Sequence, residues 1–161
     1  MINLDNAVIH HIYISEDHNF YGHHGKPAGK TPMIEVDQAV CEAGKGIVGD
    51  RFHSYKENYK GQITFFSLEV YRDICKTFGI EKLKPSVFRR NVIISGIDLN
   101  SLIDNEFNLQ GINFFGTQEA APCYWMNGVV AEGAEEAMKG RGGLRARILT
   151  NGNLKKSSIT S

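Results

Sequence analysis

The sequence predicts a mainly β domain, with antiparallel or mixed strands in a barrel-like arrangement and a few short helices. Roughly seven segments have strand character, because they are rich in β-branched and aromatic residues or alternate between apolar and polar residues. Only one segment has the full pattern of a helix. Strands at near-regular spacing without alternating helices favour a barrel over a doubly wound sheet.

The first half of the chain contains three of the predicted strands. Residues 7–15 are rich in β-branched and aromatic residues, and residues 62–66 form a short apolar run that is typical of a buried strand. Residues 33–40 alternate between apolar and polar character. We therefore expect a half-exposed strand with Ile34, Val36 and Val40 on one side and Glu35 and Asp37 on the other.

Residues 68–78 form the clearest predicted helix. Ser67 precedes the segment as a candidate N-cap, and Gly79 follows it at the position where helices commonly end. Apolar residues recur along one face of the segment at helical spacing, and Cys75 is among them. The pattern therefore predicts that Cys75 is a core residue.

The second half of the chain continues with a short apolar strand at residues 92–95. Residues 107–109 and 112–115 flank Gln110-Gly111, which predicts the two arms of a tight hairpin. The second arm is expected to lead into the segment that contains Cys123.

The C-terminal part combines a short helix with a last strand. Residues 132–139 can form the helix, and residues 144–150 have the composition of the strand. Asn151-Gly152 after this strand is a type I′ turn signal, which predicts a hairpin there. Residues 155–161 are polar and are expected to be frayed.

The composition limits the classes of function. A chain of 161 residues is expected to form a single domain over residues 1–161. Lys plus Arg equals Asp plus Glu, at 18 each, so no overall field favours nucleic acid or a membrane surface as a partner. No apolar run approaches the length of a membrane span, and the N-terminus has no signal-peptide pattern. We therefore expect a cytoplasmic protein that binds neither nucleic acid nor membranes.

The three cysteines lie far apart in the sequence and include no Cys-x-x-Cys pair. This pattern argues against a disulfide framework and against a zinc ribbon. Cys123 is distinctive, because it follows a predicted strand and lies between Pro122 and the aromatic residues Tyr124 and Trp125. A cysteine acts as a nucleophile or as a soft-metal ligand in its thiolate form, which nearby positive charge favours.

Two arginine-rich stretches, at residues 88–91 and 140–147, can supply that charge if the fold brings them to Cys123. The alternative interpretation is that Cys123 is a small buried hydrophobic residue, as free cysteines commonly are. The residues by themselves leave both interpretations open.

Four stretches, taken in order, resemble one known family. They are residues 46–53 (Gly-Ile-Val-Gly-Asp-Arg-Phe-His), residues 62–69 (Gln-Ile-Thr-Phe-Phe-Ser-Leu-Glu), residues 89–99 (Arg-Arg-Asn-Val-Ile-Ile-Ser-Gly-Ile-Asp-Leu), and Pro122-Cys123 with residues 141–146 (Arg-Gly-Gly-Leu-Arg-Ala). Together they resemble the MOSC domain, the family named after the C-terminal domain of eukaryotic molybdenum cofactor sulfurase. The resemblance extends from about the first predicted strand to Gly152.

The resemblance implies a MOSC-like β-barrel that handles the molybdenum cofactor (molybdopterin), or its sulfur, through one cysteine. Cys123 matches that cysteine and is the implied catalytic residue and metal ligand. The residues that the resemblance assigns to the pterin and phosphate of the cofactor are Arg89, Arg90, Asn91, Arg141 and Arg145, together with Asp50 and Arg51, whose turn can instead brace the barrel. A thiolate is an apt ligand for thiophilic molybdenum, and guanidinium groups suit a phosphate dianion.

Three functions remain open on this basis. The first is a molybdenum-dependent oxidoreductase that reduces N-hydroxylated compounds by oxygen-atom transfer. The second is a sulfur transferase, in which Cys123 carries a persulfide for the assembly of a metal-sulfur cofactor. The third is a module that binds an anionic ligand without chemistry. No second cysteine lies two residues before Cys123, so a paired-cysteine redox step is not expected. Since 161 residues are too few for an appended electron-transfer domain, and no lysine context typical of pyridoxal-phosphate enzymes is present, we expect an external partner, either an electron-transfer protein or a cysteine desulfurase.

Histidines are further candidates for the site. His23 and His24 lie in a long polar stretch, and His53 follows a glycine-rich turn. Imidazole suits zinc, but the spacing of these histidines is not a recurrent ligand pattern. We predict instead that the three histidines line the mouth of the Cys123 site.

Overall fold

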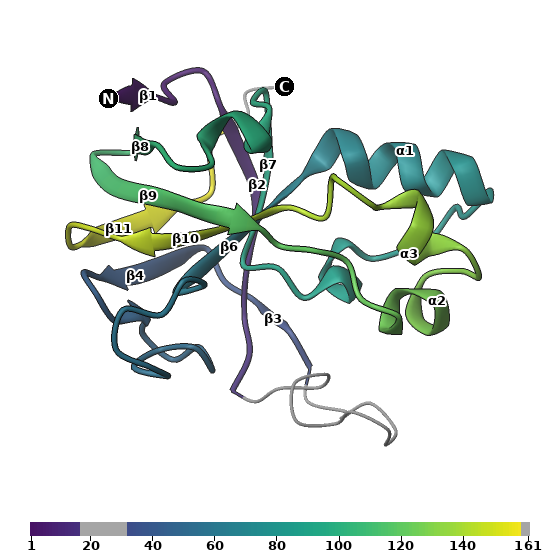
Figure 1. Cartoon of the computed structure of the whole chain (residues 1–161), viewed down its shortest axis with the longest axis horizontal. Helices are drawn as coiled ribbons and strands as arrows, with labels where there is room; N and C mark the ends of the chain where they lie inside the picture. Colours follow the sequence, from purple (N-terminus) through teal and green to yellow (C-terminus); the bar gives the residue numbers. More distant parts are fainter. Residues whose placement is uncertain (17–31, 159–161) are drawn as a thin grey trace.

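The main element of the fold is a curled, mixed β-sheet (Figure 1). A computed structural model describes residues 1–16 and 32–158 of the chain. The strands of the large sheet follow the order β1-β8-β9-β10-β6-β7-β2-β3. In that order they are β1 (Ile2–Asn3), β8 (Glu106–Leu109), β9 (Ile112–Glu119), β10 (Leu144–Ile148), β6 (Ile63–Ser67), β7 (Val92–Ser95), β2 (Val8–Ile14) and β3 (Ile34–Glu35).

A second, smaller sheet contains β11 (Gly152–Lys155), β4 (Gln38–Glu42) and β5 (Gly46–Ile47). Within the large sheet, β6 runs parallel to β7 and β1 runs parallel to β8, whereas the other neighbours are antiparallel. The prediction of a mainly β, barrel-like fold with few short helices is therefore confirmed, with the large sheet curled as a half-barrel.

Helix α1 (Leu68–Phe78) connects the parallel strands β6 and β7 and has the bounds that the sequence predicts. The Ser67 hydroxyl accepts a hydrogen bond from the backbone N–H of Val70 at 3.2 Å. Gly79 ends the helix in a left-handed conformation with a φ of 63°. Both ends of the helix are therefore fixed by local chemistry, as capping residues predict.

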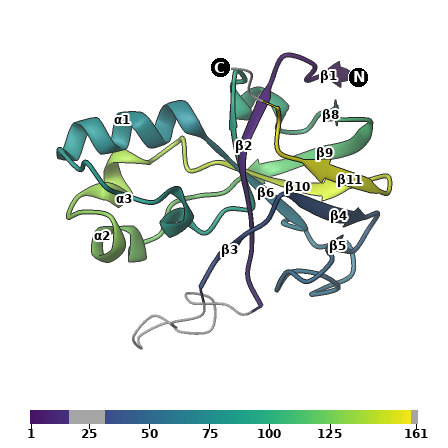
Figure 2. The same ribbon diagram turned by 180° about the vertical axis from the view of Figure 1, so that it is seen from behind.

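The remaining helices are short. They are η1 (Pro85–Phe88), η2 (Leu99–Leu102), α2 (Trp125–Val129) and α3 (Ala134–Ala137). Helix α3 lies within the predicted helix at residues 132–139, and α2 has no counterpart in the sequence-based prediction. The three α-helices gather on one side of the molecule, opposite β8, β9, β4 and β11 (Figures 1 and 2). Within the described residues, no helix has the length and apolar character that crossing a membrane requires.

Two clusters of buried apolar side chains hold these parts together. The first fills the inside of the curled sheet and includes Phe65 and Phe107, whose ring centroids are 5.8 Å apart. The second lies between the sheet and the helices and includes Phe66 and Phe88, with centroids 4.5 Å apart. Because neighbouring side chains of a strand point to opposite faces, β6 contributes to both cores.

The strand predicted over residues 33–40 is divided in two. β3 pairs with β2, whereas β4 pairs with β11 and β5, so the chain changes sheets between them. Of the predicted apolar side, Val36 packs against the first core, whereas Ile34 and Val40 are each 47% exposed and the fully buried side chains nearby are Ala39 and Cys41. A change of sheet resets which side faces inward, and alternation within the sequence does not reveal that change.

The prediction that Cys75 is a core residue is also wrong. Leu68 and Ile74 are the buried residues of α1, and Cys75 is only partly buried. The helix lies on the surface of the domain and packs on the core through Leu68 and Ile74. Cys75, next to Ile74, therefore lies at the edge of the buried face of the helix.

The predicted hairpin at Asn151-Gly152 does not form. Strand β11 follows β10 in the chain but pairs with β4 in the smaller sheet. The Asn151 side chain instead accepts a hydrogen bond from the backbone N–H of Ala43 at 2.7 Å. Asn151-Gly152 therefore lies where the chain passes from the large sheet to the smaller one, and not in a hairpin turn.

The start of the polar C-terminal tail is ordered, contrary to the prediction. The backbone N–H of Lys156 donates to the Asp37 carbonyl at 3.1 Å, and that of Ser157 donates to the Ile9 carbonyl at 2.9 Å. The first residues of the tail are therefore held by backbone hydrogen bonds, which the composition does not predict.

Candidate functional site

Cys123 lies in the irregular segment between β9 and α2. Its side chain is partly buried and packs against the second core, between the sheet and the helices. Cys41, in contrast, is fully buried in β4, and Cys75 lies on α1. The predicted site cysteine therefore belongs to a connecting segment, where binding and catalytic residues are commonly found.

The Arg90 side chain joins three backbone segments next to this cysteine. Nη1 donates to the Phe88 carbonyl at 3.0 Å, Nη2 to the Ala120 carbonyl at 3.0 Å, and Nε to the Gly142 carbonyl at 3.1 Å. The first segment precedes β7, the second follows β9 and leads to Cys123, and the third precedes β10. Arg90 therefore fixes the Cys123 segment relative to the glycine-rich segment.

Several charged groups act on Arg90. Burial lowers the pKa of Arg90 to about 10, a negative charge on Cys123 or Glu119 raises this pKa, and Arg51 and Arg145 lower it. A pKa of this size leaves the guanidinium protonated at neutral pH. One thiol, one carboxylate and three guanidinium groups therefore lie near one another, and we call Cys123, Glu119, Arg51, Arg90 and Arg145 the Cys123 cluster.

Gly142 and Gly143 allow the glycine-rich segment to pass close to its neighbours. A Cβ atom on Gly142 would lie 2.3 Å from the Ala120 carbonyl oxygen, and one on Gly143 would lie 2.3 Å from the Phe65 carbonyl oxygen. Side chains larger than hydrogen therefore cannot be placed here without moving the backbone. The glycine pair thus permits the close approach that Arg90 bridges.

Asp50 and Arg51 form a buried ion pair. Arg51 Nη1 lies 3.1 Å from Asp50 Oδ1, and the two side chains are 6% and 0% exposed for Arg51 and Asp50, respectively. The Asp50 carboxylate also accepts hydrogen bonds from the backbone N–H groups of Ser15 and Phe52. Arg51 Nη2 donates to the Arg89 carbonyl at 3.1 Å. These contacts support the bracing role of this pair, and they keep the Arg51 charge beside the cluster.

Asn91 is buried, and its amide bonds to two strands. Oδ1 accepts hydrogen bonds from the backbone N–H and the hydroxyl of Thr64 at 3.0 and 3.2 Å, and Nδ2 donates to the Tyr13 carbonyl at 3.1 Å. Arg89 is also buried, and its Nη2 donates to the Ser15 hydroxyl at 3.0 Å. Both side chains therefore tie β2 to its surroundings, and a cofactor-binding role for either stays a prediction.

Arg145 extends from β10 to the loop that follows β5. Its Nη2 donates to the Tyr59 hydroxyl at 2.6 Å, and its guanidinium lies 5.1 Å from the centroid of the Tyr59 ring. Tyr59 stacks on Phe52, and Arg51 lies 4.8 Å from the centroid of the Phe52 ring. The two aromatic rings therefore position two guanidinium groups without neutralising them.

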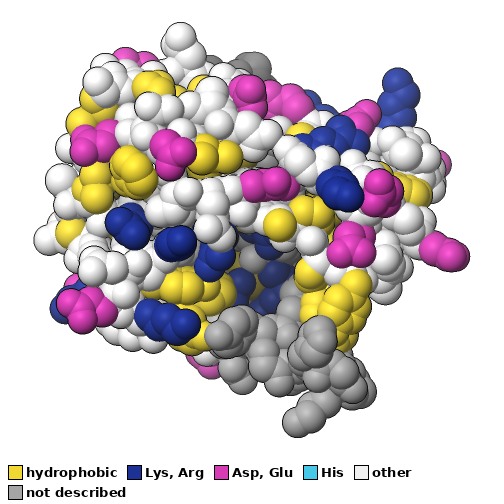
Figure 3. Space-filling view, in the orientation of Figure 1, with side chains coloured by type: hydrophobic (Ala, Val, Ile, Leu, Met, Phe, Trp, Pro, Cys, Tyr) yellow, Lys and Arg dark blue, Asp and Glu magenta, His cyan; other side chains and the backbone are white. Residues whose placement is uncertain are grey.

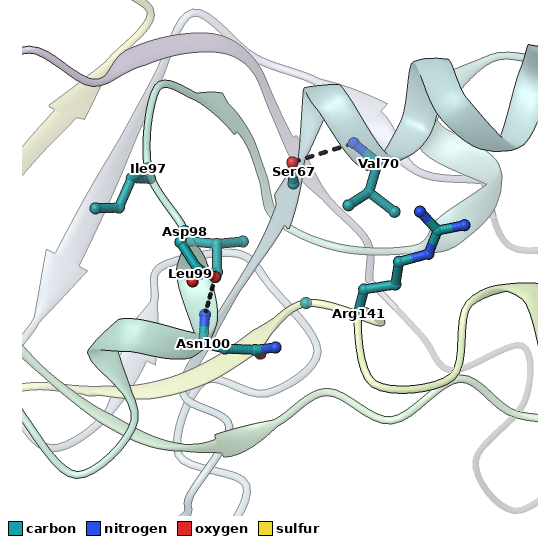
Figure 4. A pocket seen from close by; sticks show the side chains of 8 residues that line it. Ser67, Val70, Ile97, Asp98, Leu99, Asn100 and Arg141 are labelled. Atoms are coloured by element: carbon teal, nitrogen blue, oxygen red, sulfur yellow. Dashed lines mark hydrogen bonds between the residues drawn. The ribbon is translucent and has the colours of Figure 1, made fainter.

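Arg141 lies apart from the Cys123 cluster. Its Nη1 forms an ion pair with Asp73 of α1 at 2.7 Å, and its Nε donates to the Ala137 carbonyl at 2.9 Å. Figure 4 shows the guanidinium extending towards α1, beside a pocket of about 70 Å³. The other residues that line this pocket are Ser67, Val70, Ile97, Asp98, Leu99, Asn100 and Gly143. Arg141 is not among the charges that act on Arg90, so its cofactor-binding role stays a prediction.

Within the described residues, no hydrogen bond or ion pair links His53 to the Cys123 cluster. His53 Nε2 lies 3.3 Å from Glu42 Oε1, and its Nδ1 lies 3.3 Å from the Ser54 hydroxyl. His23 and His24 fall outside the described residues. Within residues 1–16 and 32–158, no three His, Cys, Asp or Glu side chains gather in a way that could hold a metal ion.

The arrangement is suited to an anionic ligand. Figure 3 shows a hollow between the strands and the helical side of the molecule, with Lys and Arg side chains inside it and hydrophobic side chains beside it. The Cys123 cluster contains three guanidinium groups but only one carboxylate, that of Glu119. One of the three, Arg51, is paired with Asp50 outside the cluster. The remaining positive charge can attract an anion to the side of a thiol.

Glu119 and Tyr59 also contact the site, although no sequence motif predicts a role for them. Glu119 Oε2 accepts a hydrogen bond from the backbone N–H of Gly142 at 3.1 Å, next to the carbonyl that Arg90 binds. The position of Glu119 shortly before Cys123 is a sequence feature that could have predicted its place in the site. Tyr59 lies in a polar stretch without a motif, so only the tertiary structure identifies it.

We predict that Asn91→Ala lowers the free energy of unfolding by about 1–3 kcal/mol, because it leaves buried donors on Thr64 without an acceptor. Urea unfolding measures the change. Asn153→Ala is the matched control, since Asn153 is exposed on β11 and should change stability by less than about 0.5 kcal/mol. Equal effects of the two substitutions would contradict the bridging role of Asn91.

We further predict that iodoacetamide alkylates Cys123 in the folded protein and leaves Cys41 unmodified. Cys41 is inaccessible, and burial raises the pKa of its thiol to about 12, so raising the pH from 7 to 9 does not expose a thiolate there. Peptide mass spectrometry of native and urea-unfolded protein measures the order of modification. Alkylation of Cys41 at the rate of Cys123 in the native protein would refute this prediction.

Comparisons with known proteins agree with this fold. The family model of the MOSC domain matches residues 21–157 of the chain. The crystal structure of the YuaD protein from Bacillus subtilis is similar with a TM-score of 0.74, 20% identity, and coverage of 93% of this chain and 91% of that one. No curated protein sequence matches the chain significantly.

Two structures of YiiM are also similar. YiiM from Escherichia coli has a TM-score of 0.61 and 17% identity, and the match covers 93% of this chain and 71% of that one. YiiM from Geobacillus stearothermophilus has a TM-score of 0.66 and 12% identity, with coverage of 92% and 71%. The TM-scores establish a shared fold. The family model, which matches most of the chain, establishes the family. The protein belongs to the MOSC domain family.

Proposed function

We propose that this protein binds a molybdenum cofactor at the Cys123 cluster, with Cys123 as a ligand of the metal, and reduces N-hydroxylated compounds. One observation carries the proposal: Cys123, Arg51 and Arg145 all lie near enough to Arg90 for their charges to act on it. Membership of a family that is associated with the molybdenum cofactor supports it.

The donor set of the cluster fits such a cofactor. A thiolate sulfur is a soft ligand that suits molybdenum, and guanidinium groups suit the oxygen atoms of a phosphate. Three of the five N–H donors of Arg90 bind backbone carbonyls, so this residue would contribute mainly its charge. Arg145 uses Nη2 for Tyr59, which leaves Nη1 for a ligand oxygen. When bound, the cofactor supplies a metal that accepts and releases an oxygen atom, and the side chains of the cluster bind and orient it.

Elemental analysis tests the metal-ligand role of Cys123. Protein purified from a host that makes the cofactor is expected to contain stoichiometric molybdenum, and Cys123→Ser is expected to lose it, because a hydroxyl is a poor soft-metal ligand. Cys75→Ser is the control and should retain the metal, since Cys75 lies on α1 away from the cluster. Molybdenum retained by Cys123→Ser, or absent from the wild-type protein, would argue against the proposal.

The second candidate function is sulfur transfer through a persulfide on Cys123. It is favoured by the packing of this thiol against the second core, which shields it partly from solvent while the cluster supplies positive charge. In this function the Cys123 thiolate attacks the outer sulfur of a persulfide on a cysteine desulfurase, whose own thiolate is the leaving group.

Intact-mass measurement tests the persulfide. After incubation with a cysteine desulfurase and cysteine, the wild-type protein and Cys75→Ser are expected to gain one sulfur atom that dithiothreitol removes. Cys123→Ser should show no gain, because the accepting thiolate is missing. If molybdenum and the persulfide are both absent, a binding module without chemistry is the remaining function, and ligand affinity would then be unchanged in Cys123→Ser.

A further inference from the structure

The outer face of β10 presents two arginines next to the Cys123 cluster. Along this strand, Leu144, Ala146 and Ile148 are buried in the first core, whereas Arg145 and Arg147 are partly exposed and alternate with them. Alternating residues of a strand share a face, so Arg147 lies on the same face as Arg145. This face continues from the cluster onto the surface of the sheet.

Two lysines extend the same surface. The Thr117 hydroxyl contacts the carbonyl oxygens of both Lys60 and Arg145, at 2.6 and 2.9 Å, which brings the Lys60 backbone beside β10. Lys56 lies over the Tyr55 ring, and Tyr55 packs against Tyr59, which binds Arg145. Lys56, Lys60, Arg145 and Arg147 therefore form a connected surface, which we call the basic strip.

The basic strip is not neutralised. Within the part of the chain that the structure describes, none of its four residues forms an ion pair, whereas Arg51, Arg141 and Lys156 do. The Nε atom of Arg147 is buried and has no hydrogen-bond partner there. The chain has no net charge, so this is a local concentration of cations. Figure 3 shows Lys and Arg side chains following one another over the sheet towards the hollow.

The chemistry of the basic strip favours an acidic protein surface over nucleic acid. Tyr59 already packs between Phe52 and the Arg145 guanidinium, and Lys56 covers Tyr55, so these rings do not offer a free platform for stacking bases. Lys56 and Lys60 are exposed, and the strip follows a sheet face and a loop rather than a pocket. Flexible surface cations of this kind steer and orient partners of opposite charge.

We infer that the basic strip is the docking surface for an acidic face of a partner protein, which is thereby held beside Cys123. This inference rests on the proposed function, because reduction or sulfur transfer at Cys123 requires a second molecule to deliver electrons or sulfur. The partner is thus an acidic electron-transfer or sulfur-donor protein, recognised by charge before it reaches the hollow.

Fluorescence anisotropy with a short labelled poly-L-glutamate tests the inference on the full chain. The wild-type protein is expected to bind the probe at low ionic strength and to release it as salt is added. The double charge reversal Lys60→Glu with Arg147→Glu is expected to weaken binding by at least about tenfold, because like charges then face the probe. The control is Lys82→Glu with Lys139→Glu, two exposed lysines outside the strip, which should change the affinity less than about twofold.

Two further measurements separate this inference from the proposed function. Poly-L-glutamate binding measured on Cys123→Ser should equal that of the wild type, and molybdenum content measured on Lys60→Glu with Arg147→Glu should be unchanged. Thermal unfolding of the double variant verifies that it is folded. Equal weakening by the control pair, or tighter binding of a single-stranded oligothymidylate that the strip variant alone abolishes, would overturn the acidic-partner assignment.

Discussion

The site depends on the hydrogen bonds of the partly buried Arg90 guanidinium. This group donates to carbonyl oxygens before β7, after β9 and before β10, so one side chain sets the relative position of three segments that are distant in the sequence. Neutral carbonyls satisfy its hydrogen bonds but do not cancel its charge. Burial lowers the pKa of Arg90 to about 10, and the group remains a cation at neutral pH. The constraint that assembles the Cys123 segment therefore also makes it electropositive.

A second polar framework surrounds this cation. Asp50, Ser15, Asn91 and Thr64 exchange buried hydrogen bonds that connect β2, β6 and the turn after β5. Buried polar groups are costly unless they are paired, and a fully paired network fixes one arrangement of the backbone. Within residues 89–91, Asn91 and Arg89 thus tie strands together, while Arg90 holds the segment that contains Cys123. Charge for a ligand is left to Arg90 and Arg145, which lie near enough for Arg145 to act on Arg90.

The fold was predictable from local patterns where the elements have local causes. Helix α1 has its own caps, and the hairpin of β8 and β9 has its Gln110-Gly111 turn, with φ of 54° and 81°. Predictions failed where a long-range partner decided the outcome. β3 and β4 separate because they pair with different sheets, and β11 pairs with β4 instead of β10. Cys75 is only partly buried because the position of α1 on the sheet, not its own periodicity, decides which side chains reach the core.

The sequence by itself determined the mainly β class and the capped helix, because these follow from residue types at short spacing, and it made Cys123 the candidate site residue. Only the tertiary structure decided which arginines accompany that cysteine. Arg90 and Arg145 join it together with Arg51, whereas Arg141 pairs with Asp73 on α1. Tyr59 and Glu119 became site residues through contacts with Arg145 and Gly142. The physical reason is that electrostatic and hydrogen-bond partners act over a few ångströms in space, and the spacing of residues along the chain does not contain those distances.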